Sequence, residues 1–154
     1  MSTHNLTGVT VTSGVPAGTP LPRFANPNVG VMEKTIDLTG SAITEDDVYQ
    51  CLPIPANTLV KQVQIEIITA AVGTTLTMDV GDASGDNSWD NDVDGKGVAG
   101  TITNSIVGTD AYAAAAARGK MYSTADTIDV TMDTATSITA GPKFYIRASY
   151  EFFG

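Results

Sequence analysis

The residues best suited to chemistry lie in one acidic stretch, GDASGDNSWDNDVDG, at positions 81–95. Asp90, Asp92 and Asp94 alternate there and are followed by a glycine, which matches the opening of a calcium loop. Alternate carboxylates before a tight turn supply the converging oxygens that Ca²⁺ requires. The match ends at the twelfth position, where Thr101 replaces the bidentate glutamate. The stretch therefore predicts either a calcium site outside an EF-hand or an acidic, solvated surface loop.

Trp89, the only tryptophan of the chain, lies in the same stretch. It either covers the rim of a sheet as a plug of the core or contacts a partner protein from an exposed loop. A lone aromatic side chain in a polar loop usually packs back onto its own domain, which favours the plug.

No other set of residues predicts catalysis. The chain has one histidine, His4, and one cysteine, Cys51, which excludes a zinc cluster, a Cys–His dyad or a Ser-His-Asp triad within a folded core. Cys51 fits the pattern of a small core or edge residue. The glycines punctuate turns and form no phosphate-binding loop. We therefore expect a non-enzymatic protein without a cofactor, apart from calcium at the acidic stretch.

The composition excludes several classes of partner. The formal net charge is −9, and 42% of the residues are hydrophobic while only 16% are charged. An acidic chain is a poor ligand for nucleic acid or for an anionic membrane surface. No apolar run approaches the roughly 20 residues of a membrane span, and the N-terminus lacks the layout of a signal peptide. We expect synthesis and folding in the cytoplasm.

The elements that would position these residues are β-strands. Residues 58–69 alternate strictly, with Val63, Ile65 and Ile67 on one face and polar side chains on the other, which predicts a half-buried strand. The same pattern predicts further strands at 31–38, 48–52, 75–80, 121–124, 127–133 and 143–153. Residues 81–100 are predicted as a long loop, and Asp110–Gly119 as a short helical insert. The fold class is therefore all-β, a single antiparallel β-sandwich of jelly-roll type, with a partly closed barrel as the alternative.

The first 30 residues differ from the rest of the chain. They hold four prolines and no acidic residue, so they are predicted to form an extended arm that cannot fold alone. The domain division is therefore an arm at 1–30 and a sandwich at 31–154. The arm is held by its own domain, by a sister subunit or by another protein. The arm residues expected to make this contact are Val9, Val11, Val15, Pro16, Pro20, Leu21, Pro22 and Phe24.

Four segments carry a resemblance to a known class of protein. They read IPANTLVKQVQIEI, TLTMDVGDASGDNSWD, YSTADTIDVTM and TAGPKFYIRASYEF, and they lie between Ile36 and Phe153. In layout this region resembles small structural proteins of the virions of tailed bacteriophages, especially marine and cyanobacterial phages. The resemblance implies a β-rich decoration, cement or head-fibre component of the capsid, often trimeric. The arm is outside the resemblance.

These observations predict a capsid decoration or cement protein on the outer surface of a virion. Its expected partners are the major capsid protein and further copies of itself, with a trimer favoured. Two alternatives stay open. One is a tail or head-fibre adaptor that binds a receptor, and the other is a calcium-dependent carbohydrate-binding module.

Overall fold

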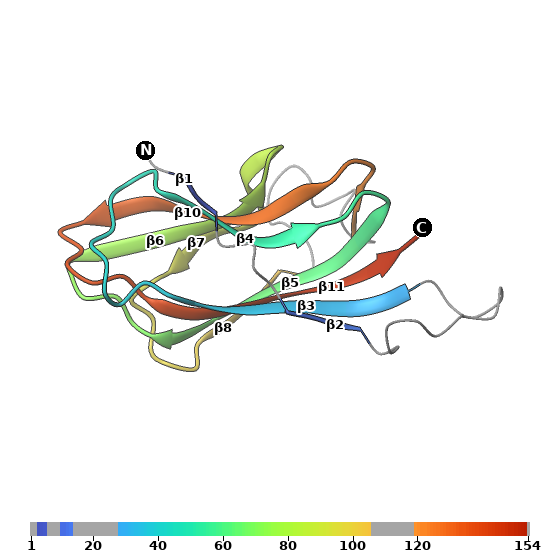
Figure 1. Ribbon diagram of the computed structural model, residues 1–154. Helices are drawn as coiled ribbons and strands as arrows, with labels where there is room; N and C mark the ends of the chain where they lie inside the picture. Colours follow the sequence, from blue (N-terminus) through green and yellow to red (C-terminus); the bar gives the residue numbers. More distant parts are fainter. Residues whose placement is uncertain (1–2, 6–9, 14–27, 106–118, 154) are drawn as a thin grey trace.

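Two β-sheets pack face to face in the computed structural model (Figure 1). The structure describes residues 3–5, 10–13, 28–105 and 119–153, with side chains from 29 to 102 and from 119 to 153. These residues form strands, turns and bends but no helix, and therefore no helix that could span a membrane. The strands are β1 (Thr3–Asn5), β2 (Thr10–Ser13), β3 (Asn28–Asp37), β4 (Val48–Ile54), β5 (Thr58–Thr69), β6 (Thr75–Asp82), β7 (Gly85–Asp94), β8 (Ile102–Ser105), β9 (Lys120–Tyr122), β10 (Asp126–Thr136) and β11 (Lys143–Phe152).

The two sheets are built from strand pairs that enclose one another along the chain, with β6–β7 as the innermost pair and β3–β11 as the outermost. The five-stranded sheet has the order β1-β4-β10-β6-β7, and the six-stranded sheet has the order β2-β3-β11-β5-β8, with β9 also paired to β5. From β3 to β6, successive strands alternate between the two sheets. The pairs are antiparallel and nested: β6 with β7, β5 with β8 and β9, β4 with β10, and β3 with β11. The all-β, two-sheet architecture that the sequence predicts is confirmed.

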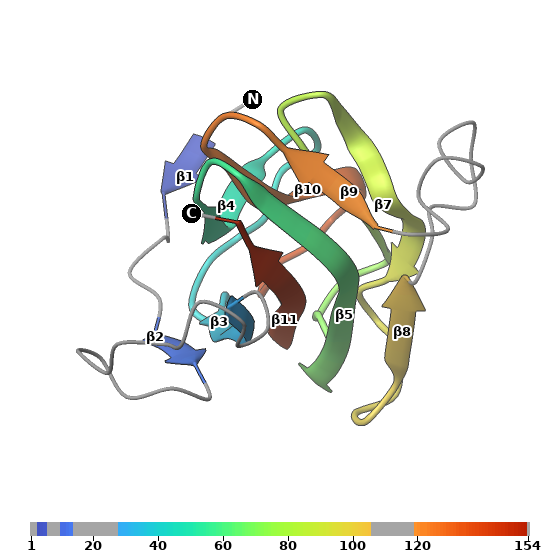
Figure 2. The same ribbon diagram turned by 90° about the vertical axis from the view of Figure 1, so that its right-hand side faces the viewer.

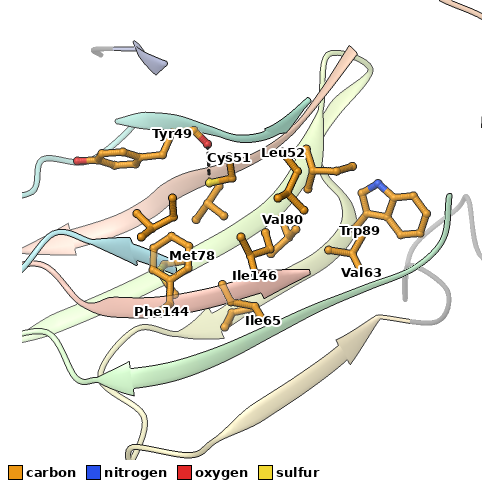
Figure 3. Packing of buried hydrophobic residues seen from close by; sticks show 14 of the residues in the cluster. Tyr49, Cys51, Leu52, Val63, Ile65, Met78, Val80, Trp89, Phe144 and Ile146 are labelled. Atoms are coloured by element: carbon orange, nitrogen blue, oxygen red, sulfur yellow. Dashed lines mark hydrogen bonds between the residues drawn. The ribbon is translucent and has the colours of Figure 1, made fainter. Parts of the chain in front are cut away.

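Period-two alternation located the strands that line the core. β5 has the predicted bounds, and Val63, Ile65 and Ile67 are all buried. In β11, Phe144 and Ile146 point inward and are fully buried, as their alternation predicts. Figure 3 shows Val63, Ile65, Phe144 and Ile146 packed against residues of the opposite sheet, such as Met78 and Val80. Burial of each large apolar side chain contributes about 1.5–3 kcal/mol.

Cys51 lies inside this core. Its side chain is fully buried, and its Sγ lies 3.1 Å from the carbonyl oxygen of Tyr49 (Figure 3). Burial raises the pKa of the thiol far above its ordinary value of 9.0. Because the thiolate is the reactive form, Cys51 serves packing here, as its sequence pattern predicts.

The predicted long loop at residues 81–100 is wrong. Half of this range is β7 (Gly85–Asp94), which forms a tight hairpin with β6. The alternation of β7 was hidden by a β-bulge: Met78 pairs with Val93 and Val80 pairs with Asp90, so β7 holds one extra residue. Asp92, at this bulge, has a positive φ of 58°. The bulge shifts the inward-facing positions and breaks the period-two pattern in the sequence.

The N-terminal residues that the structure describes pair with the edges of the sandwich. β1 lies beside β4, and β2 lies beside β3, on the same side of the molecule (Figure 2). β3 begins at Asn28, before the predicted domain start at residue 31. The division into arm and sandwich stays a prediction. The predicted helix at 110–119 lies outside the described residues except for Gly119.

Candidate functional site

The three aspartates of the predicted calcium site all lie on β7. Asp90 is partly buried, while Asp92 and Asp94 are exposed. Asp90 and Asp94 accept hydrogen bonds from nearby backbone N–H groups, those of Asn91 and Lys96. Asp92 accepts one from the side-chain amide of Asn91. Each of the three carboxylates therefore accepts a hydrogen bond from a residue one or two positions away in the sequence.

Within the described ranges, no three His, Cys, Asp or Glu side chains are close enough to hold a metal ion. The aspartates are spread along a strand, whereas a calcium loop brings its oxygens together at a tight turn. Calcium binding stays a prediction from the sequence, and the geometry of β7 adds no support to it.

Trp89 is a plug of the core and lies on β7 rather than in a loop. Its side chain is 1% exposed, and its Nε1 donates a 2.9 Å hydrogen bond to the Tyr122 hydroxyl. Tyr122 belongs to β9, so this bond joins the edge of the five-stranded sheet to the six-stranded sheet. The plug interpretation is therefore the one that the structure supports. As a fully buried residue, Trp89 offers no contact surface to a partner.

Asp82, at the end of β6, is the centre of a buried polar network. Its Oδ2 accepts a 2.6 Å hydrogen bond from the Tyr122 hydroxyl and forms an ion pair with Lys120 Nζ at 2.5 Å. Its Oδ1 accepts hydrogen bonds from the hydroxyls of Ser84 and Ser88, at 2.6 and 3.3 Å. A side chain that is only 5% exposed thus has its charge matched by a cation and several donors.

The network favours fixed protonation states. Burial alone would raise the pKa of Asp82, but the hydrogen bonds from Lys120, Ser84 and Tyr122 lower it below its ordinary value of 3.8. Burial, followed by the bond to Asp82, raises the pKa of Tyr122 far above 10.0. A permanently ionised carboxylate and a permanently protonated phenol suit a structural joint between sheets. Neither is poised to transfer a proton near neutral pH.

The outer face of the five-stranded sheet is acidic. Asp79 on β6 is buried, and its Oδ1 accepts a hydrogen bond from the backbone N–H of Asp92. Burial, with smaller contributions from the nearby carboxylates of Asp133, Asp86 and Asp92, raises the pKa of Asp79 to about 6. The pKa of Asp129 on β10 is also raised to about 6, mainly by burial. This face therefore concentrates carboxyl groups that repel one another.

The outer face of the six-stranded sheet is different. Its centre is a shallow groove in which two cross-strand rows meet, Val31–Ser149–Gln62 and Glu33–Arg147–Gln64. The groove is lined by Val31, Gln62, Gln64, Arg147 and Ser149. The sequence showed which residues of β11 point outward. It did not show that residues from three strands form a groove, because the pairing register is a long-range property.

Of the predicted arm residues, only Val11 lies within the described part of the chain. It is in β2, where its backbone is paired with Met32 of β3. The others lie outside the described residues: Val9, Val15, Pro16, Pro20, Leu21, Pro22 and Phe24. Their role in binding stays a prediction.

Known proteins are similar to this chain in fold rather than in sequence. No protein-family model matches the chain, and no curated protein matches it. A chain from the capsid asymmetric unit of cyanophage Pam1 has a TM-score of 0.65 at 16% identity, covering 91% of this chain and 95% of that one. A chain from the capsid of Ralstonia phage GP4 has a TM-score of 0.61 at 18% identity, covering 88% and 91%. A chain from the acidic stable capsid of Helicobacter pylori bacteriophage KHP30 has a TM-score of 0.55 at 15% identity, covering 80% and 87%.

These similarities confirm, at the level of fold, the resemblance to β-rich structural proteins of phage virions. All three matched chains come from capsid structures. In each pair, most of both chains is covered, so the matched chains are close to this chain in length.

Proposed function

We propose that this chain is a non-enzymatic structural protein of a phage virion that binds the outer surface of the capsid as a decoration or cement protein. The observation that carries the proposal is the fold similarity to chains from three phage capsids, over 80–91% of this chain and 87–95% of those chains. A similarity that covers most of both chains indicates a shared domain rather than a shared motif.

The strand pairing supports a jelly-roll architecture. β3-β11-β5-β8 and β4-β10-β6-β7 are two four-stranded sets, and the nested pairs are those of a long antiparallel ribbon folded over on itself. Eight-stranded double sheets of this kind occur in capsid and lectin domains. The architecture therefore fits a capsid protein and is also compatible with the carbohydrate-binding alternative.

The polar residues support a non-enzymatic role. The buried network around Asp82 uses its carboxylate, phenol and ammonium groups to satisfy one another, with Trp89 donating from the core side. Among the described residues, the one cysteine is buried. This arrangement stabilises the joint between the sheets and leaves no free pair of acid and base within it.

The charge and the arm suit attachment to a shell. A net charge of −9 keeps a protein soluble on an exposed surface. β1, β2 and the start of β3 pair with the chain's own sandwich, and the other residues of the arm would add backbone hydrogen bonds and small apolar contacts to the major capsid protein or a sister subunit. Many weak contacts on one particle combine through effective concentration. In this proposal, further copies assemble as trimers on the shell.

The experiment is a binding assay with capsids that lack this protein. The full chain should co-sediment with them to saturation and raise the temperature at which the particles break. A chain without residues 1–27 should remain folded by circular dichroism, because β3–β11 are intact, but should lose most of its binding. Failure of the full chain to bind would refute the proposal. Full binding by the truncated chain would refute the role of the arm alone.

A further inference from the structure

The two sheets carry very different charges. β4, β6, β7 and β10 contain no Lys or Arg. Their acidic residues are Asp79, Asp82, Asp86, Asp90, Asp92, Asp94, Asp126, Asp129 and Asp133. In β3, β5, β9 and β11 the two signs are balanced: the acids are Glu33, Asp37, Glu66 and Glu151, and the bases are Lys34, Lys61, Lys120, Lys143 and Arg147. The molecule therefore has one strongly acidic sheet and one nearly neutral sheet.

Arg147 is the cation at the centre of the neutral sheet. Its side chain is exposed and lines the groove between Gln64 and Ser149. Two lysines of the same face are already paired: Lys61 with Glu151 at 2.7 Å and Lys143 with Asp37 at 3.0 Å. In the part of the chain that the structure describes, Arg147 forms no ion pair.

The cross-strand neighbour of Arg147 is engaged elsewhere. Glu33 lies directly opposite on β3, but its carboxylate accepts a short hydrogen bond from the Tyr145 hydroxyl. The Arg147 side chain is exposed and in no ion pair among the described residues, so its guanidinium donors are accessible to a partner. Guanidinium groups bind carboxylates in a bidentate manner, which gives both energy and orientation.

Apolar side chains border the same face at both ends. At one end, Val29, Glu151, Leu59 and Met121 form one cross-strand row, in which Val29 and Met121 are about half exposed. At the other end, Ile102 pairs with Glu66 on the outer face, and it too is about half exposed. A central hydrogen-bonding cation with apolar margins is a common layout for a protein-binding surface, in which arginine is enriched.

We propose that the outer face of the six-stranded sheet is the surface that docks on the capsid, and that Arg147 receives a carboxylate of the capsid protein. This inference rests on the proposed function and adds an orientation to it. The acidic five-stranded sheet then faces away from the shell. The partner surface presents an Asp or Glu side chain, or a chain terminus, beside apolar side chains.

A second copy of the chain is a poorer occupant of this face. Each copy carries a net charge of −9, so free copies repel one another before any contact forms. The acidic sheet is a poorer docking surface for the same partner, because its carboxyl groups would oppose the carboxylate that Arg147 attracts.

The test compares full-length variants in the capsid-binding assay. Arg147→Glu should weaken binding at least about tenfold, and Arg147→Gln should weaken it less. Lys143→Gln is the matched control on the same strand and face, and Asp133→Asn is the control on the acidic sheet; both should bind like the native chain. Thermal unfolding checks that each variant is folded. Because Arg147 and Asp133 are exposed and Lys143 is partly exposed, these substitutions should leave the fold intact.

The outcomes separate the two proposals. If the native chain binds and Arg147→Glu binds equally well, the docking face is wrong while the capsid function stands. If Asp133→Asn weakens binding and Arg147→Glu does not, the acidic sheet is the docking face and the inference is overturned. If sedimentation without capsids shows that Arg147→Glu abolishes self-association, the partner is a second copy, which also overturns it. If the native chain does not bind, the proposed function itself fails.

Discussion

Asp82 accepts bonds from Lys120, Tyr122 and Ser84, and through them it fastens the β6–β7 hairpin to β9. No feature of the sequence marked this group as a unit. Asp82 and Lys120 are 38 positions apart, and their contact depends on strands in different sheets. Only residue types were visible in the sequence, and it was the fold that brought an acid, a base and a phenol together.

Replacing Lys120 should destabilise the sandwich. Lys120→Met leaves the buried Asp82 carboxylate without its cation, which costs about 3 kcal/mol when one partner of a buried pair is removed. Urea unfolding at neutral pH measures the change. Lys61→Met is the matched control, because the Lys61 side chain is 46% exposed and its pair with Glu151 is worth less than about 1 kcal/mol. Equal effects of the two substitutions would contradict a structural role for the network.

The raised pKa of Asp79 predicts an unusual dependence of folding stability on pH. Its pKa is raised to about 6 in the folded protein from an ordinary value of 3.8. Between these values the folded state binds a proton that the unfolded state has lost, so the contribution of Asp79 to stability falls as the pH rises from about 4 to 6.

Asp79→Asn should therefore stabilise the protein at pH 7.5 by about 1 kcal/mol, after a discount for solvent screening, and change little at pH 4. Asparagine keeps the Oδ1 acceptor for the N–H of Asp92. Urea unfolding at both pH values is the measurement. A change of the same size at both pH values would show that the carboxyl group does not titrate in this window.

At the scale of elements, the β6–β7 hairpin is the part of the sandwich core that the sequence pattern did not predict. β5 and β11 were predictable because strict alternation gives a strand one buried and one exposed face. β7 was not, because a bulge at Asp92 and a polar composition hide its alternation. β1 and β2 were missed as well, because they are three and four residues long and owe their strand form to pairing with β4 and β3.

The hairpin depends on a close backbone approach at Gly81. A Cβ there would lie 2.1 Å from the carbonyl oxygen of Gly85 and 2.2 Å from that of Asp86. Gly81→Ala should therefore force the hairpin to shift and destabilise the fold by about 2 kcal/mol or more. Gly85→Ala is the matched control, since its Cβ would meet only side-chain atoms, Ser88 Oγ at 3.3 Å and Asn87 Oδ1 at 4.0 Å, and it should cost below about 1 kcal/mol. A thermal unfolding series that ranks the two variants in the opposite order would contradict this description of the hairpin.

At the scale of the whole molecule, composition and layout predicted the all-β class of the fold. They did not reveal the charge separation between the sheets. Acidic residues are spread along the sequence, and only the strand order collects β4, β6, β7 and β10 into one sheet without a cation. Acidity is therefore concentrated on one sheet, and the docking face that we propose is the opposite one.

The most direct test of the central claim is the copy number of this chain in purified particles of the virus that encodes it, measured against the major capsid protein by quantitative mass spectrometry. A decoration or cement protein should be present at a number comparable to that of the capsid protein. A number tens of times lower would move the chain to the tail or to a single vertex and favour the adaptor alternative. Absence from the particle would contradict a virion role and favour a free binding module.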